Sequence, residues 1–163
     1  MKILGIDPGS TRAGYGVIEF DKNHQVFISG GIIDIKSKDK NNRLAELEKG
    51  INKIIKKNGP DLVGIEKLYF VKNMKTALEV AQSRGVLILC CVKEKIPILE
   101  FTPLEIKQGI TGWGGADKKS VELWVKKILK IENLKEVDDV FDALAIAIVT
   151  GYSFLNNKFQ NQG

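Results

Sequence analysis

Three β-rich runs separated by short turns, at residues 3–6, 14–20 and 25–35, constrain the fold more than any other feature of the sequence. Runs joined by such short connections predict an antiparallel meander. Two further apolar runs, at residues 61–66 and 97–101, each follow a stretch with helical spacing, and the first is expected to lie parallel to an earlier strand. The pattern predicts an α/β fold with a five-stranded mixed sheet flanked by helices.

Hydrophobic periodicity and stop signals place the helices between and after these strands. Helices are predicted at residues 42–57, 73–95, 117–130 and 137–154, with a shorter one that begins at Thr102-Pro103. Asn58-Gly59-Pro60 is expected to end the first of them. The helix over residues 73–95 is apolar on more than one side, so we expect it to contact both the sheet and a further surface.

The chain of 163 residues fits one ordinary domain, and no linker or repeat divides it, so a single domain over residues 1–163 is expected. No apolar stretch approaches the roughly 18 residues of a membrane helix, and Asp7 comes too early for a signal peptide. Cys90 and Cys91 are neighbours in an apolar run and are expected to be buried free thiols. Together these features predict a cytoplasmic protein.

Four carboxylates occupy positions that suggest chemistry. Asp7 and Glu66 each end an apolar strand, at the kind of sheet edge where open α/β sheets carry their sites. Asp139 and Asp142 are three residues apart and share one face of the last helix. Solvated strand ends and acids that complement a helix dipole are the alternative interpretations. Asp142 fits the second of these poorly, because it lies among apolar residues where an unpartnered carboxylate is costly and a metal is a candidate partner.

Carboxylates without a ligand cysteine or a nearby histidine select hard cations, Mg²⁺ or Mn²⁺, over zinc. Two such ions about 3.5–4 Å apart can clamp the attacking and leaving oxygens of a phosphodiester. The chain also carries 25 Lys and Arg against 20 Asp and Glu, a surplus that suits a phosphate backbone. The opening stretch 5–11 resembles the phosphate loop of sugar kinases and actin-like ATPases, but those proteins need two lobes and this chain has the length of one.

Taken in order, the motifs resemble those of the RuvC family of Holliday junction resolvases over nearly the whole chain. The stretches that carry the resemblance are Gly5-Ile-Asp-Pro-Gly-Ser10, Gly14-Tyr-Gly16, Ile65-Glu66, Lys72-Asn73, Ala81-Gln-Ser-Arg-Gly85 and Asp139-Val-Phe-Asp-Ala-Leu-Ala-Ile-Ala147. The resemblance implies a ribonuclease-H-like fold and a homodimer. It also implies an endonuclease that resolves four-way DNA junctions by paired symmetric nicks during homologous recombination and DNA repair.

The same resemblance implies roles for individual residues. Asp7, Glu66, Asp139 and Asp142 fall on the family's acidic tetrad, which implies two Mg²⁺ ions per subunit, with Mn²⁺ as a substitute. Lys107 and Lys118 match basic positions associated with phosphate contact or catalysis, and Tyr69 matches an aromatic that stacks on unpaired bases. A branch-migration motor is the further partner implied.

Several assignments stay open at the level of sequence. Tyr69 can stack on DNA or cover the core, and Trp113, in the loop 111–115, can grip DNA or pack underneath. Leu78, Leu87 and Leu89 are the candidates for the dimer interface. Two rival functions are a shorter nuclease of the same fold linked to ribosomal RNA maturation and a junction-binding protein without catalysis. The stretch from Glu66 to Asn73 and the complete acidic tetrad argue against them.

Overall fold

The computed structural model describes residues 1–68 and 74–160 and contains one five-stranded sheet in the order β3-β2-β1-β4-β5. The strands are β1 (Lys2–Asp7), β2 (Arg12–Phe20), β3 (Gln25–Asp34), β4 (Leu62–Glu66) and β5 (Ile98–Phe101). The first three form the expected antiparallel meander, while β4 runs parallel to both β1 and β5. The predicted mixed sheet of five strands is therefore confirmed.

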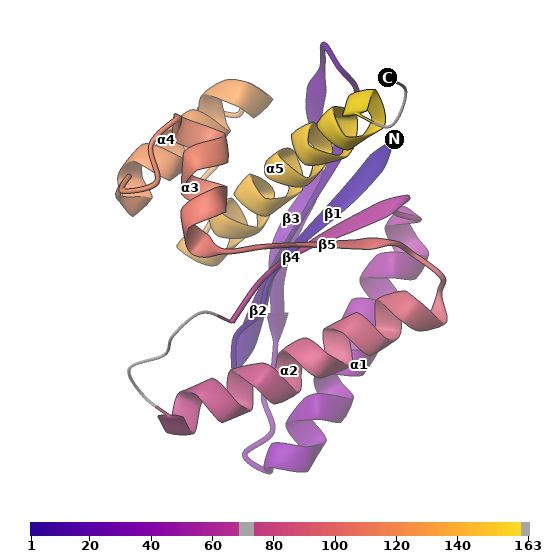
Figure 1. Cartoon of the computed structure of the whole chain (residues 1–163). Helices are drawn as coiled ribbons and strands as arrows, with labels where there is room; N and C mark the ends of the chain where they lie inside the picture. Colours follow the sequence, from indigo (N-terminus) through magenta and orange to yellow (C-terminus); the bar gives the residue numbers. More distant parts are fainter. Residues whose placement is uncertain (69–73, 161–163) are drawn as a thin grey trace.

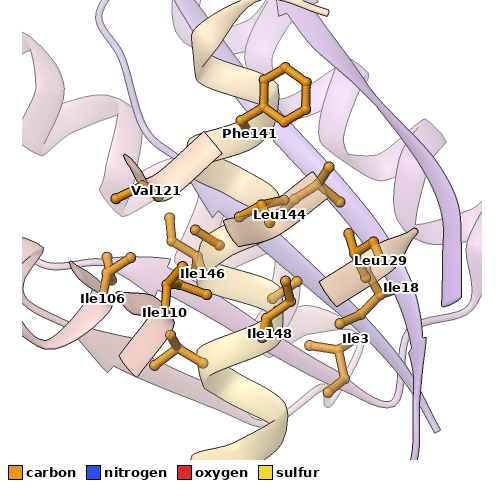
Figure 2. Close-up of a cluster of buried hydrophobic side chains, with 14 of the residues drawn as sticks. Ile3, Ile18, Ile106, Ile110, Val121, Leu129, Phe141, Leu144, Ile146 and Ile148 are labelled. Carbon is orange, nitrogen blue, oxygen red and sulfur yellow. The ribbon is translucent and has the colours of Figure 1, made fainter. Parts of the chain in front are cut away.

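Helices cover both faces of this sheet. They are α1 (Lys40–Asn58), α2 (Met74–Lys93), α3 (Pro103–Thr111), α4 (Lys118–Leu129) and α5 (Asp138–Gln160). Figure 1 shows α1 and α2 on one face and α3, α4 and α5 on the other. Each face has its own buried core, because successive side chains of β1 alternate between the two: Ile3 packs beneath α5, and Leu4 packs beneath α1 and α2. Figure 2 shows the core beneath α3, α4 and α5.

The helix ends form where capping residues predict them. Gly59 adopts a left-handed conformation that ends α1, and its N–H donates to the carbonyl of Ile55. Thr102 and Glu105 form a reciprocal capping box at the start of α3, with Pro103 in the first helical position. The side chain of Asp117 accepts a hydrogen bond from the N–H of Ser120 at the start of α4. These caps fix the end of α1 and the starts of α3 and α4.

A row of glycines crosses the sheet. Gly5 of β1 is paired with Gly16 of β2 on one side and with Gly64 of β4 on the other, and Gly16 is paired in turn with Gly30 of β3. A Cβ added at Gly5 would overlap the carbonyl oxygen of Ala143, so α5 lies with its backbone directly against the strand. Glycine permits this close approach because it has no side chain to separate helix and sheet.

The other three glycines of the row also face α5. A Cβ at Gly30 would crowd Val140, one at Gly16 would crowd Leu144, and one at Gly64 would overlap the hydroxyl of Thr150. Beside the row, a Cβ at Gly14 would overlap the carbonyl of Asp139, at the start of the helix. The glycine row therefore fixes both the height of α5 above the sheet and the place where its acidic first turns lie.

Two features of α2 complete the comparison with the sequence. Cys90 and Cys91 are buried free thiols, as expected. Leu87 is also fully buried, in the core between α2 and the sheet, and the expectation that it forms part of an exposed interface is wrong.

Among residues 1–68 and 74–160, no helix combines the length and apolarity needed to cross a bilayer.

Candidate active site

Strand alternation places Asp7 and Glu66 on the face covered by α5. Each carboxylate lies two residues beyond a glycine of the row, Asp7 beyond Gly5 and Glu66 beyond Gly64, and residues two apart in a strand point to the same face. Because β1 and β4 are parallel and Gly5 is paired with Gly64, both carboxylates reach the same end of the sheet. Helix α5 supplies the third carboxylate, Asp142, to the same place.

These three carboxylates line one pocket of about 280 Å³. Its walls come from β1, β4, α3, α4 and α5, and its lining residues are Asp7, Glu66, Pro103, Ile106, Lys107, Lys118, Val121, Asp142 and Ile146. Residues from distant parts of the sequence thus meet at one end of the sheet. Both lysines singled out in the sequence, Lys107 and Lys118, lie in this pocket as well.

The electrostatic state of the pocket follows from burial and crowding. Burial, reinforced by repulsion from Glu66, Asp142 and Asp139, raises the pKa of Asp7 from 3.8 to about 8. The pKa of Glu66 is raised by burial and then by Asp142, and the pKa of Asp142 is raised chiefly by burial. Perturbed carboxylates grouped in a cleft are typical of functional sites.

Lys118 partly compensates this negative charge. Its Nζ donates a hydrogen bond to Oδ2 of Asp142 at 3.2 Å, and the attraction of that carboxylate raises the pKa of the lysine. Lys118 also lowers the pKa of both Asp7 and Glu66, and Lys107 lowers the pKa of Glu66. The carboxylates thus form a negative centre of the pocket, and the ammonium groups of Lys107 and Lys118 form its positive border.

Asp139 lies apart from the other three carboxylates. It is not among the residues that line the pocket, and its Oδ2 pairs with Nε of Arg12 at 2.5 Å. It nevertheless lies close enough to Asp7 to raise the pKa of that carboxyl. Arg12, the first residue of β2, was not singled out in the sequence, because a single arginine gives no signal of its partner.

The donor set of carboxylate oxygens fits a hard divalent cation. Within residues 1–68 and 74–160, no three Asp, Glu, His or Cys side chains are close enough together to surround one ion. Asp142 and Asp139 are instead each held by a cationic side chain. Buried carboxylates whose pKa values are raised by mutual repulsion are stabilised when a cation binds among them, and oxygen ligands suit Mg²⁺ or Mn²⁺.

Arg84 holds the end of β4 from the opposite face of the sheet. Its Nε donates to the carbonyl oxygen of Glu66 at 3.2 Å, and its Nη2 lies 2.6 Å from Oε2 of Glu100 on β5. The guanidinium thereby connects α2 to both parallel strands beside the pocket. The sequence placed Arg84 in a motif without a role, and the structure shows that it contacts the main chain of a pocket residue.

Two aromatic residues from the sequence analysis have different outcomes. Tyr69 lies outside the described residues. Trp113 does not pack underneath the loop 111–115, because the residue is 69% exposed.

A larger hollow of about 530 Å³ lies on the opposite face of the sheet, between β3 and α1. Its carboxylates are Asp34 and Glu46, and Glu46 accepts hydrogen bonds from the N–H groups of Lys36 and Ser37. None of the four carboxylates predicted from the sequence to be catalytic lines this hollow. The smaller pocket at the strand ends is therefore the candidate active site.

Comparison with known proteins agrees with this geometry. The family model described as crossover junction endodeoxyribonuclease RuvC matches residues 3–150. The chain belongs to the RuvC family. It is 43% identical to the RuvC of Petrotoga mobilis, with 100% of this chain and 99% of that protein covered. It is 45% identical to the RuvC of Caldicellulosiruptor saccharolyticus over 91% of this chain and 90% of that one.

Solved RuvC structures have the same fold. The Thermus thermophilus RuvC structure matches with a TM-score of 0.86 at 24% identity, covering 96% of this chain and 97% of that chain. A structure of T. thermophilus RuvC in complex with a Holliday junction substrate matches with a TM-score of 0.88 at 24% identity, covering 96% of both chains. The ribonuclease-H-like fold implied by the sequence resemblance is thus confirmed.

The raised pKa of Asp7 predicts how stability depends on pH in the absence of divalent ions. Since the pKa is about 8 in the folded protein and 3.8 ordinarily, the folded state holds the extra proton between these values, and stability falls as pH rises from about 4 to 8. Asp7→Asn cannot ionise and should lose less stability. At pH 8 it should exceed the parent by at least about 1.4 kcal/mol, or about 3–6 °C in Tm.

Calorimetric melting of both proteins from pH 4 to 8 in a chelating buffer checks this expectation. Asp138→Asn is the matched control, because Asp138 is exposed and does not line the pocket. Parallel Tm curves for the parent and Asp7→Asn would contradict the electrostatic description of the pocket.

Proposed function

We propose that this chain resolves four-way DNA junctions by two symmetric, metal-dependent nicks, during homologous recombination and DNA repair. The observation that carries the proposal is the pocket in which Asp7, Glu66 and Asp142, from three different elements, meet two lysines. Membership of a family whose relatives are named crossover junction endodeoxyribonucleases supports the same reaction. A protein that only binds DNA gains nothing from carboxylates gathered at such electrostatic cost.

The proposed cofactor is a pair of Mg²⁺ ions per subunit, with Mn²⁺ as a substitute. Asp7, Glu66 and Asp142 would hold them, together with Asp139 once its carboxylate leaves Arg12. The chemistry that such ions supply when bound is activation of a water nucleophile and neutralisation of charge that develops on the phosphate. The raised pKa of Asp7 supports this assignment, because it reflects a site that favours added positive charge.

The chain's own residues have distinct tasks in this proposal. Asp7 carries a proton on its carboxyl over part of the neutral range, and it must release that proton to become a ligand. Lys118, now 3.2 Å from Oδ2 of Asp142, and Lys107 at the same pocket are positioned to contact the scissile phosphate. By resemblance, Tyr69 stacks on unpaired bases near the crossover, and a branch-migration motor delivers the junction.

We further propose a homodimer, because two symmetric incisions require two sites related by a two-fold axis. Helix α2 offers an apolar stripe for the contact, in which Leu78 is 64% exposed, Leu89 is 52% exposed and Val92 is 58% exposed. Ala81 and Gly85 lie along the same exposed side and are small enough to let two helices approach. Arg84, on the same helix, connects this stripe to the main chain of Glu66.

Asp7→Asn is predicted to abolish junction cleavage and to leave junction binding within about threefold of the parent. Catalysis depends on the charge of the pocket, whereas phosphate contacts from the basic surface supply most of the affinity. Cleavage is measured on synthetic four-way junctions and matched linear duplexes with and without Mg²⁺, and binding by gel shift in chelator. Asp138→Asn should cleave like the parent. A parent that cuts linear duplex as fast as junction, or an active Asp7→Asn, would contradict the proposal.

Leu89→Glu is predicted to convert the dimer to a monomer, because it places a charge in the apolar stripe of α2. Light scattering at micromolar concentration measures the mass, and junction cleavage should fall at least tenfold. Leu123→Glu on α4 is the matched control, since Leu123 is also 52% exposed but lies on the other face of the sheet. A monomeric parent that cleaves both strands would overturn the dimer.

A further inference from the structure

The loop between α3 and α4 presents an exposed tryptophan beside the candidate active site. Trp113 is 69% exposed, and the large apolar side chain of Leu104, on α3, is 61% exposed. A Cβ added at Gly114 would lie 2.7 Å from Cδ1 of Leu104, so the loop packs on this leucine. Two large apolar side chains therefore lie in solvent on one contiguous part of the surface, which marks a candidate binding site.

The indole of Trp113 is supported from below. A Cβ added at Gly115 would lie 2.6 Å from Cζ2 of Trp113, so one side of the ring rests on the glycine backbone. The opposite side of the ring faces solvent, which explains why Trp113 is 69% exposed. Because Gly115 has no side chain, the indole can pack directly against the main chain at this position.

Hydrogen bonds hold the loop in this conformation. The Thr111 hydroxyl accepts from the N–H of Trp113 at 3.2 Å and lies 2.9 Å from its carbonyl oxygen, to which the N–H of Ala116 also donates at 3.2 Å. Gly112, in a left-handed conformation, ends α3 through a bond to the carbonyl of Gln108. Trp113 is consequently held in place before any ligand arrives, which lowers the entropic cost of binding.

A hollow of about 490 Å³ adjoins this loop and borders the catalytic pocket. It is lined by Thr102, Pro103, Leu104, Lys107 and Gly114. Pro103 and Lys107 line both this hollow and the pocket of the carboxylates. A strand whose phosphate lies in the catalytic pocket would therefore bring its neighbouring nucleotide to the hollow.

Lysines border the hollow beside two capping carboxylates. Glu105 accepts from the N–H and hydroxyl of Thr102, and Asp117 accepts from the N–H of Ser120, so the lone pairs of both carboxylates are directed at their own helix ends. Lys107 borders the hollow and Lys118 begins the helix that follows the loop. An apolar, aromatic surface with a basic border is the combination that binds single-stranded nucleic acid by stacking.

We propose that Trp113, with Leu104 and the adjoining hollow, forms a subsite that stacks an unpaired nucleobase of the strand being cut. This inference rests on the proposed function and adds a second stacking residue to it, on a different element from Tyr69. The subsite accepts any base, because every base has a π-face. It holds the nucleotide next to the scissile phosphate out of the duplex and so aligns that phosphate with the carboxylates.

The test uses the intrinsic fluorescence of Trp113. The chain has two tryptophans, and Trp124→Phe leaves Trp113 as the single reporter. In chelator, adding a four-way junction should quench this fluorescence, and a matched linear duplex should quench it less. Trp113→Ala should bind and cleave the junction about tenfold more weakly, while Trp113→Phe, which keeps an aromatic ring, should stay within about threefold of the parent.

Gly115→Ala provides a matched variant that keeps the indole but fills the space in which the ring packs on the main chain of residue 115. The added methyl displaces the ring, so junction affinity should fall toward that of Trp113→Ala while the Tm of both variants stays near that of the parent. Unquenched Trp113 fluorescence, or a Trp113→Ala enzyme as active as the parent, would overturn the subsite and leave the nuclease proposal intact. Quenching in a parent that never cuts junctions would support the subsite and overturn the proposed function.

Discussion

The close packing of α5 on the glycine row is the interaction on which the rest of this structure depends. Gly5, Gly16 and Gly64 stand side by side on three neighbouring strands, and the helix backbone lies directly on the middle one. Any side chain there would lift α5 and carry Asp142 away from the strand ends. The carboxylates meet because β1 and β4 are parallel, are in register at two glycines, and are covered by a helix held close to them.

This packing gathers groups that repel one another. The fold holds Asp7, Glu66 and Asp142 in one small pocket, and burial and repulsion raise the pKa of each. Lys118 and Arg12 offset part of the charge by pairing with Asp142 and Asp139. A pocket of this kind gains stability whenever a cation enters or a proton binds. In the proposed mechanism, the electrostatic cost of the unliganded site is the source of its affinity for a divalent ion.

Most of the fold and part of the site could be predicted from the sequence. Two matching runs, Gly5-Ile-Asp7 and Gly64-Ile-Glu66, contain both the glycines on which α5 packs and the carboxylates two residues beyond them. Strand alternation alone places each acid on the same face as its glycine. The pairing of Asp139 with Arg12 and the burial of Leu87 could not be predicted, since each depends on which neighbour a side chain meets in three dimensions. The packing of Trp113 on Gly115 likewise depends on loop geometry, which hydrophobic periodicity does not predict.

The most direct measurement of this account combines the stability and the Mn²⁺ affinity of Gly5→Ala. The added methyl overlaps the backbone of α5 at Ala143, so the helix must shift. We expect the free energy of unfolding to fall by about 1–3 kcal/mol or more. In the protein that remains folded, the Mn²⁺ affinity measured by electron paramagnetic resonance should fall at least about tenfold. A variant as stable as the parent, with the same Mn²⁺ affinity, would contradict the claim that the glycine row assembles the site.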